Sequence, residues 1–340
     1  MTAYPKFRAA AVQAAPEFLD TSATVDKACR LIAEASAHGA ELIAFPEVFV
    51  SAYPYWNWTM TPVEGGPWFE KLFHAAIDIP GPEVAALCAA ARAADAHVVI
   101  GVNERDPYSL GTLYNSVLFI SNTGELLGVH RKLVPTWAEK LTWAGGDGSS
   151  LRVYDTGIGR LGGLACGENT NTLARFSLLA QGEQVHIANY IALPVAPAEY
   201  DMVEAIKTRA AAHSFEGKVF TIVACAAITD QIVDTVAHNE AARALLERPH
   251  SAFSGIFGPD GRLMTTPLID EEGIVYADID INASIQPKQM HDIIGHYNRF
   301  DIFQLSVNQQ PQSSVVLNSH QAPTFPPPHF TEVPGETETA

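Results

Sequence analysis

The sequence predicts an α/β protein in which helices cover a mixed β-sheet. Short apolar segments alternate with segments of helical periodicity, and the links between them are brief. A strand, a helix and a second strand joined in this way form a parallel pair that the helix covers. Apolar residues make up 47% of the 340 residues and charged residues 17%, so the chain can bury a large core. These features are compatible with one large layered domain.

The first half of the chain contains this parallel unit, followed by a hairpin. Residues 7–13 form the first apolar strand, and residues 24–38 have apolar side chains at helical spacing until Gly39 ends the helix. Residues 41–45 form the second strand. The hairpin makes the sheet mixed, because its two strands run antiparallel. The remaining ranges are 82–94 for a second helix, 97–102 for a third strand, and 113–120 and 126–129 for the hairpin.

The second half continues the alternation and ends in a tail. The apolar run at 161–165 predicts a buried strand, and the apolar spacing after it predicts a helix capped by Asn169 or Thr170. From about residue 304 the chain is polar and proline-rich and cannot form a core of its own. We therefore expect a domain at 1–303 and a tail at 304–340, which either wraps a neighbouring subunit or is disordered. The other expected elements are strands at 184–189, 219–225, 254–257 and 274–279 and a helix at 203–216.

Composition limits the partners and the compartment. The 21 basic and 38 acidic residues give a net charge of −17, which argues against nucleic acid and anionic membrane surfaces as partners. The four cysteines lie far apart without a CxxC pair, which argues against a metal site or a disulfide framework and favours a reducing compartment. No leader sequence opens the chain and no apolar run reaches about 18 residues, so we expect a cytoplasmic protein.

Three chemically reactive side chains each follow an apolar strand. Glu47 follows the second strand, Lys132 the hairpin and Cys166 the strand at 161–165. Ligands of open α/β sheets collect at the carboxyl ends of strands, and a cysteine at the start of a helix has a lowered thiol pKa. Each residue alone has an ordinary explanation, as a capping glutamate, a solvated lysine or an inert core cysteine. Together they indicate covalent acyl-type chemistry. In such chemistry the carboxylate takes the thiol proton and later activates water, the lysine stabilises negative charge, and the thiolate attacks.

Longer motifs surround these residues in a fixed order: FPEVF at 45–49, RKLVPT at 131–136, EK at 139–140, Trp143 before GDGS at 146–149, CGE at 166–168, EG at 216–217, GPDG at 258–261 and HYNRFDIF at 296–303. In content and order they resemble the nitrilase branch of the carbon–nitrogen hydrolases, over about residues 5 to 303. The resemblance implies a four-layer α-β-β-α sandwich that forms homodimers and larger spiral homo-oligomers, with the C-terminal region taking part. It also implies that Glu47 is the base, Lys132 the charge stabiliser, Cys166 the nucleophile and Glu139 a supporting carboxylate.

The resemblance predicts hydrolysis of a nitrile to a carboxylic acid and ammonia through a thioimidate and an acyl-enzyme. The reaction needs no metal and no organic cofactor. An aliphatic amidase that uses the same residues on an amide is the alternative within this class. A catalytically silent assembly protein is the alternative from another class, and the intact trio of Glu47, Lys132 and Cys166 argues against it.

The expected substrate carries an apolar, aromatic group close to the nitrile carbon, as an arylacetonitrile does. Aromatic residues follow both Glu47 and Lys132, and aromatic walls favour ring packing. The alternative is that these aromatics stabilise a long loop or a subunit contact. Typical members of the family have a tryptophan directly after the cysteine and a histidine two residues later. Here Gly167 and Asn169 stand at these positions, and we expect Gly167 to leave room beside Cys166. The residues expected to bind the substrate are Tyr53, Trp56, Trp137, Gly167 and Asn189.

Overall fold

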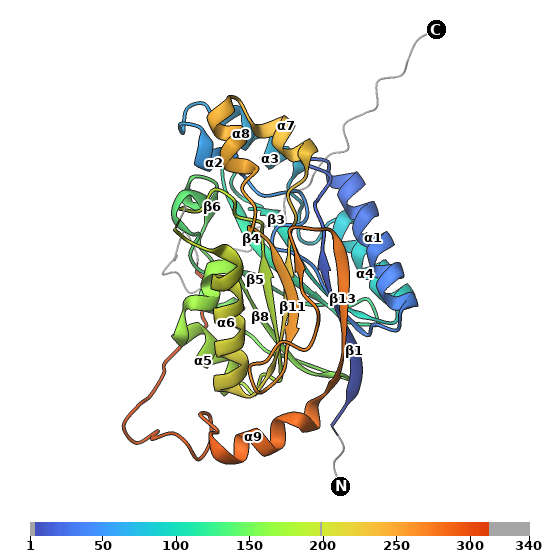
Figure 1. The fold of residues 1–340 in the computed structure, drawn as a ribbon, viewed down its shortest axis with the longest axis vertical. Helices are drawn as coiled ribbons and strands as arrows, with labels where there is room; N and C mark the ends of the chain where they lie inside the picture. The colour runs from blue at the N-terminus through green and yellow to red at the C-terminus, as the bar shows by residue number, and fades with distance from the viewer. Residues whose placement is uncertain (1–3, 198, 313–340) are drawn as a thin grey trace, which may run out of the picture.

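Two β-sheets pack face to face, and a pair of helices covers the outer face of each (Figure 1). The computed structural model describes residues 4–197 and 199–312. The four layers follow the order helices, sheet, sheet, helices, which confirms the α-β-β-α sandwich that the resemblance implies. Within the described ranges, no helix is long and apolar enough to cross a membrane.

The first sheet joins the beginning and the end of the folded domain. Its strands are β1 (Lys6–Gln13), β2 (Leu42–Ala44), β3 (His97–Arg105), β4 (Leu113–Ile120), β5 (Leu126–Arg131), β6 (Trp143–Ala144) and β13 (Gly273–Asp280). They follow the order β13-β1-β2-β3-β4-β5, and β6 pairs with β4. The pairs β1–β2 and β2–β3 are parallel, whereas β13 runs antiparallel to β1, and β4 runs antiparallel to β3 and β5. The sheet is therefore mixed, as the hairpin predicts.

The second sheet carries the cysteine strand near one edge. Its strands are β7 (Tyr154–Thr156), β8 (Gly159–Ala165), β9 (Val185–Tyr190), β10 (Phe220–Cys225), β11 (Phe253–Phe257) and β12 (Leu268–Ile269), in the order β12-β11-β10-β9-β8-β7. The central strands β8, β9 and β10 are parallel, so their carboxyl ends lie at the same edge of the sheet.

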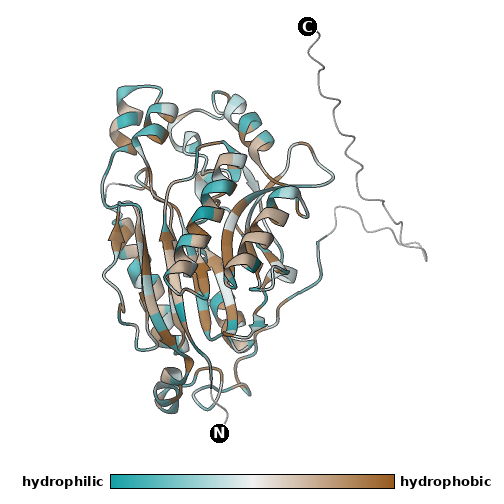
Figure 2. Cartoon of the chain, turned by 90° about the vertical axis from the view of Figure 1, so that its right-hand side faces the viewer, coloured by the Kyte–Doolittle hydropathy of each residue, from teal (hydrophilic) through white to brown (hydrophobic). Residues whose placement is uncertain are grey.

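Two helices cover each sheet. The helices α1 (Thr21–Ala37) and α4 (Pro82–Ala94) pack on the first sheet, and α5 (Thr172–Ala180) and α6 (Met202–Gly217) pack on the second (Figure 1). The strand β1 shows why the apolar runs are continuous. Ala10 and Val12 face the helices, whereas Ala9 and Ala11 face the second sheet, so both faces of the strand are buried. Figure 2 shows the strands as the most hydrophobic layer.

The short elements differ most from the sequence-based expectation. The region after Glu47, predicted as a loop, contains two helices, and further short helices follow β10 and β13. Their 4 to 10 residues are too few for a periodicity signal, and packing rather than pattern determines them. These helices are α2 (Trp56–Thr59), α3 (Gly66–Ala75), α7 (Asp230–Val236), α8 (Glu240–Leu246) and α9 (Ile285–Met290).

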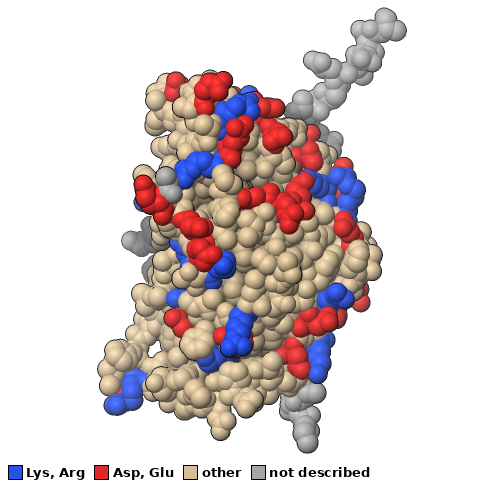
Figure 3. All heavy atoms as spheres, viewed as in Figure 1, with Lys and Arg blue, Asp and Glu red and all other residues tan. Residues whose placement is uncertain are grey.

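The start of the predicted tail lies against the loop that follows β6. The backbone N–H of Gln312 donates to Asp147 Oδ2 at 2.7 Å, and Val307 packs on the apolar cluster that contains Leu151. Residues 313–340, most of the tail predicted at 304–340, lie outside the described residues. On the face drawn in Figure 3, basic side chains lie among acidic ones.

Candidate active site

Glu47 stands just beyond β2, at the point where the two sheets meet. Gly101 of β3 permits this placement, because a Cβ atom there would lie 2.5 Å from the carbonyl oxygen of Pro46 and 2.3 Å from the backbone nitrogen of Val48. From the second sheet, the side chain of Asn189 donates to the carbonyl oxygen of Phe45. The backbone before Glu47 is thus held by both sheets.

Lys132 lies between two carboxylates in the interior of the protein. Its Nζ is 2.8 Å from Glu47 Oε1 and 2.7 Å from Glu139 Oε2, and all three residues are at most 2% exposed. Asn115 of β4 donates to the same Glu47 Oε1 at 2.8 Å. A buried cation is tolerated only when its charge and its donors are matched in this way. Glu47 Oε2, in contrast, has no hydrogen-bond partner among the described residues.

Glu139 is held by the turn that carries it. The 3-10 helix η1 (Trp137–Leu141) follows Thr136, whose backbone N–H donates to Glu139 Oε2 at 2.7 Å. The hydroxyl of Tyr53 donates to Glu139 Oε1 at 3.1 Å and accepts from the indole N–H of Trp58 at 3.0 Å. Glu139 lies seven residues after Lys132, and the turn between them brings its carboxylate into contact with the ammonium group.

Cys166 occupies a tight corner at the end of β8. Its φ angle is +47°, in the left-handed region that residues other than glycine seldom adopt. The 3-10 helix η3 (Cys166–Thr170) begins at this corner, and α5 begins only at Thr172. Asn171 caps that helix by accepting from the backbone N–H groups of residues 173 and 174, so the predicted caps Asn169 and Thr170 are wrong. The main helix starts too late for its dipole to act directly on the thiol.

Glu168 joins the cysteine corner to the lysine segment. One carboxylate oxygen accepts from the backbone N–H of Leu133 at 2.7 Å, and the other accepts from that of Ala165 at 2.8 Å. His130 Nε2 lies 3.1 Å from the same carboxylate. Burial alone would raise the pKa of Glu168, but His130 and the two N–H donors lower it. The carboxylate thus links the chain before Cys166 to the residue after Lys132.

The charges in this site set the proton positions before any reaction. Burial and the carboxylate of Glu47 raise the pKa of the Cys166 thiol well above its ordinary value, although Lys132 acts in the opposite direction. The expected lowering of the thiol pKa is therefore wrong. Burial would lower the pKa of Lys132, but Glu139 and Glu47 together raise it well above its ordinary value. Burial also raises the pKa of Glu47. The resting site contains a thiol, an ammonium group and a nearby carboxylate able to take a proton.

Comparison with known proteins identifies the family. The model of the family described as carbon–nitrogen hydrolase matches residues 8–289. An aliphatic nitrilase of Rhodococcus rhodochrous is 38% identical over 94% of this chain and 88% of that protein. A nitrilase of a Bacillus species is 37% identical over 91% of this chain and 90% of that protein. The chain belongs to the nitrilase branch of the carbon–nitrogen hydrolase family.

Solved structures share the nitrilase fold. A carbon–nitrogen hydrolase from Helicobacter pylori aligns with a TM-score of 0.65 at 18% identity, covering 84% of this chain and 93% of that chain. An amidase from Nesterenkonia sp. aligns with a TM-score of 0.59 at 18% identity, covering 82% and 92%. At these identities the likeness concerns the fold alone.

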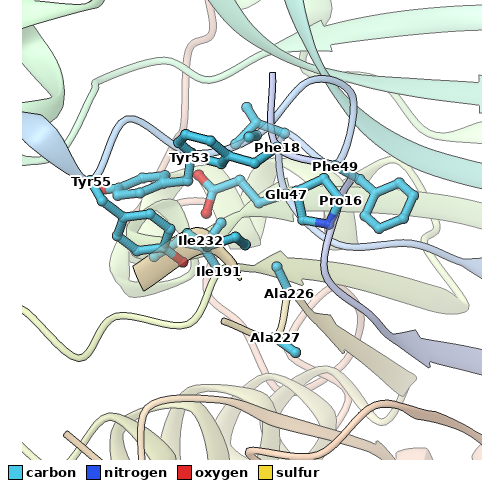
Figure 4. A pocket seen from close by; sticks show the side chains of 12 residues that line it. Pro16, Phe18, Glu47, Phe49, Tyr53, Tyr55, Ile191, Ala226, Ala227 and Ile232 are labelled. Carbon is cyan, nitrogen blue, oxygen red and sulfur yellow. The ribbon is translucent and has the colours of Figure 1, made fainter. Parts of the chain in front are cut away.

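A small cavity adjoins Glu47 in this nitrilase fold. Its volume is about 10 Å³, which is room for about one water molecule. Figure 4 shows Glu47 beside the rings of Tyr53 and Tyr55, which pack edge to face with centroids 5.0 Å apart. The other walls are apolar and come from segments that follow strands of both sheets and from helix α7. Among them are Phe18, Phe49, Ile191 and Ile232.

The residues predicted to bind the substrate lie in different surroundings. Tyr53 lines the cavity beside Glu47, and Asn189 is buried next to the segment that carries Glu47. Trp56 is also buried, but it stacks on Trp68 with ring centroids 5.6 Å apart. Trp137 is 71% exposed. The structure thus brings Tyr53 and Asn189 to the site and places the two tryptophans in the surrounding loops, so their binding role stays a prediction.

Gly167 lies directly against a neighbouring loop. A Cβ atom at this position would lie 2.8 Å from Thr136 Oγ1, so the space beside the glycine is already filled by the segment after Lys132. The glycine permits close approach of two loops, and the expectation of open space beside Cys166 for the substrate stays a prediction.

Several residues of the site escaped the sequence analysis. Asn115 donates to Glu47 directly, and Glu168 accepts from the backbone N–H of Leu133, the residue after Lys132. The hydroxyl of Tyr190 is buried without a partner among the described residues, and Tyr190 belongs to the same apolar cluster as Cys166. A signal existed for Asn115, which is a polar residue within an apolar strand. A second signal was Glu168, an acidic residue in an otherwise neutral corner.

Proposed function

We propose that the chain hydrolyses a nitrile to the carboxylic acid and ammonia through covalent intermediates on Cys166. The observation that carries the proposal is the buried contact of Lys132 with both Glu47 and Glu139. This contact lies where the two sheets meet. The identity of 37% and 38% to proteins named nitrilases supports a nitrile as the substrate.

In the first step Glu47 takes the thiol proton while the sulfur attacks the nitrile carbon. Glu47 Oε1 is occupied by Lys132 and Asn115, which leaves Oε2 free to accept the proton. The carbon–sulfur bond forms, one π bond of the nitrile breaks, and Glu47 passes the proton that it took from sulfur to the nitrogen, giving a neutral thioimidate and a free carboxylate. The ammonium group of Lys132 stabilises the negative charge that develops on the nitrogen.

Two waters complete the reaction. The first adds to the thioimidate with Glu47 as general base, and loss of ammonia leaves a thioester on Cys166. The second hydrolyses the thioester, releases the carboxylic acid and returns the proton to sulfur. The overall balance is one nitrile and two waters converted to one acid and one ammonia, and no step needs a metal or an organic cofactor.

Matched substrates test this proposal against the amidase alternative. We expect ammonia release from a nitrile with a kcat/KM higher than that for the amide of the same carbon skeleton. Hydrolysis of the amide with no ammonia from any member of a nitrile panel would establish the aliphatic amidase instead.

We infer that the substrate is apolar near the nitrile carbon, with an arylaliphatic nitrile as the expected class. The rings of Tyr53 and Tyr55 beside Glu47 support this inference, since rings can add about 0.5–1.5 kcal/mol per well-packed aromatic pair. A cavity of about 10 Å³ admits a phenyl ring only if side chains move. The test compares kcat/KM for phenylacetonitrile with that for butyronitrile. A clear preference for the aliphatic substrate would overturn the aromatic part of the proposal and leave nitrile hydrolysis intact.

We also infer that the protein forms homodimers that build larger spiral homo-oligomers, in the cytoplasm. Exposed apolar side chains after β13 support self-association. Light scattering coupled to size exclusion tests the assembly, and a monomer at micromolar concentration would contradict it. The wide spacing of the four cysteines supports the compartment. The exposed side chains are Ile285, Met290, Tyr297, Phe300, Ile302, Phe303 and Leu305.

A further inference from the structure

A row of four buried polar side chains runs from helix α6 to the main chain of the Cys166 corner. The row consists of His213 on α6, Glu183 before β9, His186 on β9 and Asn169 in η3, each at most 4% exposed. His213 Nε2 lies 2.8 Å from Glu183 Oε2, and Glu183 Oε1 lies 2.7 Å from His186 Nδ1. His186 Nε2 then lies 2.8 Å from Asn169 Oδ1.

Asn169 connects this row to the backbone on both sides of Ala165. Its amide nitrogen donates to the carbonyl oxygen of Leu164 at 3.0 Å and to that of Cys166 at 3.1 Å. Carbonyl oxygens only accept, so the amide nitrogen must face them and Oδ1 must face His186. The two hydrogen bonds span the corner at which Cys166 has its φ of +47°.

The hydrogen bonds also assign the protons along the row. His186 Nε2 faces the oxygen of Asn169, which can only accept, so Nε2 donates, and His186 Nδ1 faces the carboxylate of Glu183. Burial would raise the pKa of Glu183, but the two histidines lower it to about 2. Burial, with His186 beside it, lowers the pKa of His213 to about 4. His213 is therefore neutral, with its proton on Nε2.

We propose that the row from His213 to Asn169 positions the Cys166 corner for nucleophilic attack. His186 and Glu183 hold the amide of Asn169 in one orientation, and the amide holds the corner in its left-handed conformation. These side chains act through the backbone and are positioning residues. The inference rests on the proposed function for its consequence in catalysis, but the geometry of the corner can be measured independently through the reactivity of the thiol.

The same three side chains could also surround a cation. Glu183, His186 and His213 each offer a ligand atom, and these atoms lie within 4.8 Å of one another. In the structure, however, His186 Nδ1 and His213 Nε2 lie 2.7 and 2.8 Å from the two oxygens of Glu183, which are hydrogen-bond distances. Metal content is for this reason one arm of the test.

Two pairs of variants separate the contribution of the hydrogen bonds from that of the charge. Asn169→Asp keeps the shape and the acceptor for His186 but removes both donations to the corner, and Asn169→Ala removes all contacts. Glu183→Gln keeps every hydrogen bond, because its oxygen can accept from His213 and its nitrogen can donate to a neutral His186. Glu183→Leu removes them. Ser214→Ala is the matched control, since it deletes a buried hydrogen bond of 2.8 Å to Thr221, next to His213 in sequence but outside the row.

Each variant is assayed for kcat, for KM, for thermal unfolding and for the rate at which iodoacetamide alkylates Cys166. The alkylation is followed by mass spectrometry of the peptide and needs no turnover. For both Asn169 variants and for Glu183→Leu we expect kcat and the alkylation rate to fall roughly 10- to 100-fold, the effect of a displacement on the order of 1 Å. We expect KM to change by less than about threefold, because the row does not touch the substrate. In the variants Glu183→Gln and Ser214→Ala, the hydrogen bonds from Asn169 to the corner stay intact. Both rates should therefore stay within about threefold of wild type in Glu183→Gln and within about twofold in Ser214→Ala.

A folded Asn169→Asp protein with the wild-type alkylation rate would overturn the proposal. If the Asn169 variants do not fold, the Glu183 pair decides, and equal loss in Glu183→Gln and Glu183→Leu would overturn it. One bound zinc per wild-type chain that is lost in Glu183→Gln would replace it with a metal site. If Cys166 is alkylated as expected but no nitrile is hydrolysed, the proposed function fails while the positioning role stands.

Discussion

Two buried polar networks meet at the Cys166 corner, and they differ in where their unused hydrogen-bond acceptor lies. The network of Glu47, Lys132 and Glu139 contains two carboxylates and one cation, and Glu47 Oε2 has no partner among the described residues. In the row behind the corner, both carboxylate oxygens of Glu183 are occupied, and the buried atom without a partner among the described residues is His213 Nδ1, at the far end of the row from Cys166. An unused acceptor beside a thiol can take its proton, whereas one at the far end of the row cannot. The comparison assigns chemistry to the first network and positioning to the second.

The largest expected effect is the loss of the nucleophile. Cys166→Ala should abolish nitrile turnover while the protein stays folded, because the covalent intermediates cannot form. Ammonia release under saturating nitrile measures it. Cys29→Ala and Cys88→Ala, at half-buried positions on α1 and α4, are the matched controls and should keep activity. Turnover by Cys166→Ala at the wild-type rate would contradict the assignment of chemistry to the network of Glu47, Lys132 and Glu139.

Changes to the first network should come next in size. Glu47→Gln keeps the side-chain shape but cannot take the thiol proton, and we expect kcat to fall by about 10²–10⁴-fold. Lys132→Arg keeps the charge, but a guanidinium has a different size and different donor directions and cannot match two carboxylates around one nitrogen. It should lose activity to a similar degree. Circular dichroism checks the fold, and a wild-type rate in either variant would assign that residue a structural role.

Glu139→Gln should have a smaller effect with a distinct pH signature. Burial and Glu47 are the main causes of the raised pKa of Cys166, and Glu139 adds to them. Removing its charge should shift the pH profile of iodoacetamide alkylation at Cys166 to lower pH, and kcat should fall roughly 10-fold because Lys132 loses one partner. A profile that is unchanged or shifted to higher pH would mean that the Glu139 charge does not reach the thiol.

The smallest effect concerns stability rather than rate, and it sharpens the description of the second network. His213 has a pKa lowered to about 4 in the folded protein from an ordinary 6.5, by burial and by the neighbouring charges of His186 and Arg175, although Glu183 acts in the opposite direction. Between pH 6.5 and about 4, the unfolded chain therefore binds a proton at His213 that the folded protein does not bind. The associated stability is complete above pH 6.5 and is lost as the pH falls toward 4, by about 3 kcal/mol in total.

The variant His213→Gln isolates this contribution. Its amide nitrogen can still donate to Glu183 but does not titrate, so the free energy of unfolding should vary less between pH 6.5 and 4.5 than in wild type. The depressed pKa of Glu183 contributes stability that is lost only below about pH 4.5, outside this window. Urea unfolding at several pH values measures the difference, and equal slopes in the two proteins would show that His213 is not kept neutral by burial.

The sequence predicted the regular layers of this fold well. Helix α4 and strand β4 have the predicted bounds, because a long apolar pattern with clear ends determines each of them. The sequence also predicted that Glu47, Lys132 and Cys166 each follow an apolar strand, and in the structure they follow β2, β5 and β8, which belong to two different sheets. The resemblance named Glu139 as a supporting carboxylate, and the structure shows that its contact with Lys132 depends on the 3-10 turn that begins at Trp137.

The sequence could not predict features that depend on contacts between distant segments. The thiol pKa depends on burial and on Glu47, which lies more than a hundred residues from Cys166 in the chain. A prediction from the helix dipole alone takes neither of these into account. The surroundings of Gly167 depend on where Thr136 lies. The row from His213 to Asn169 joins three elements and the loop that carries Glu183, and its histidines are unremarkable in the sequence because each occurs alone in an apolar segment.

The most direct test of the central claim is to locate the covalent intermediate. Wild-type enzyme is mixed with excess nitrile, quenched with acid within the first turnovers and digested for peptide mass spectrometry. The account predicts an added mass equal to the thioimidate or the acyl group on the peptide that carries Cys166, and on none that carries Cys29, Cys88 or Cys225. An adduct on any of those peptides in place of the Cys166 peptide would contradict it.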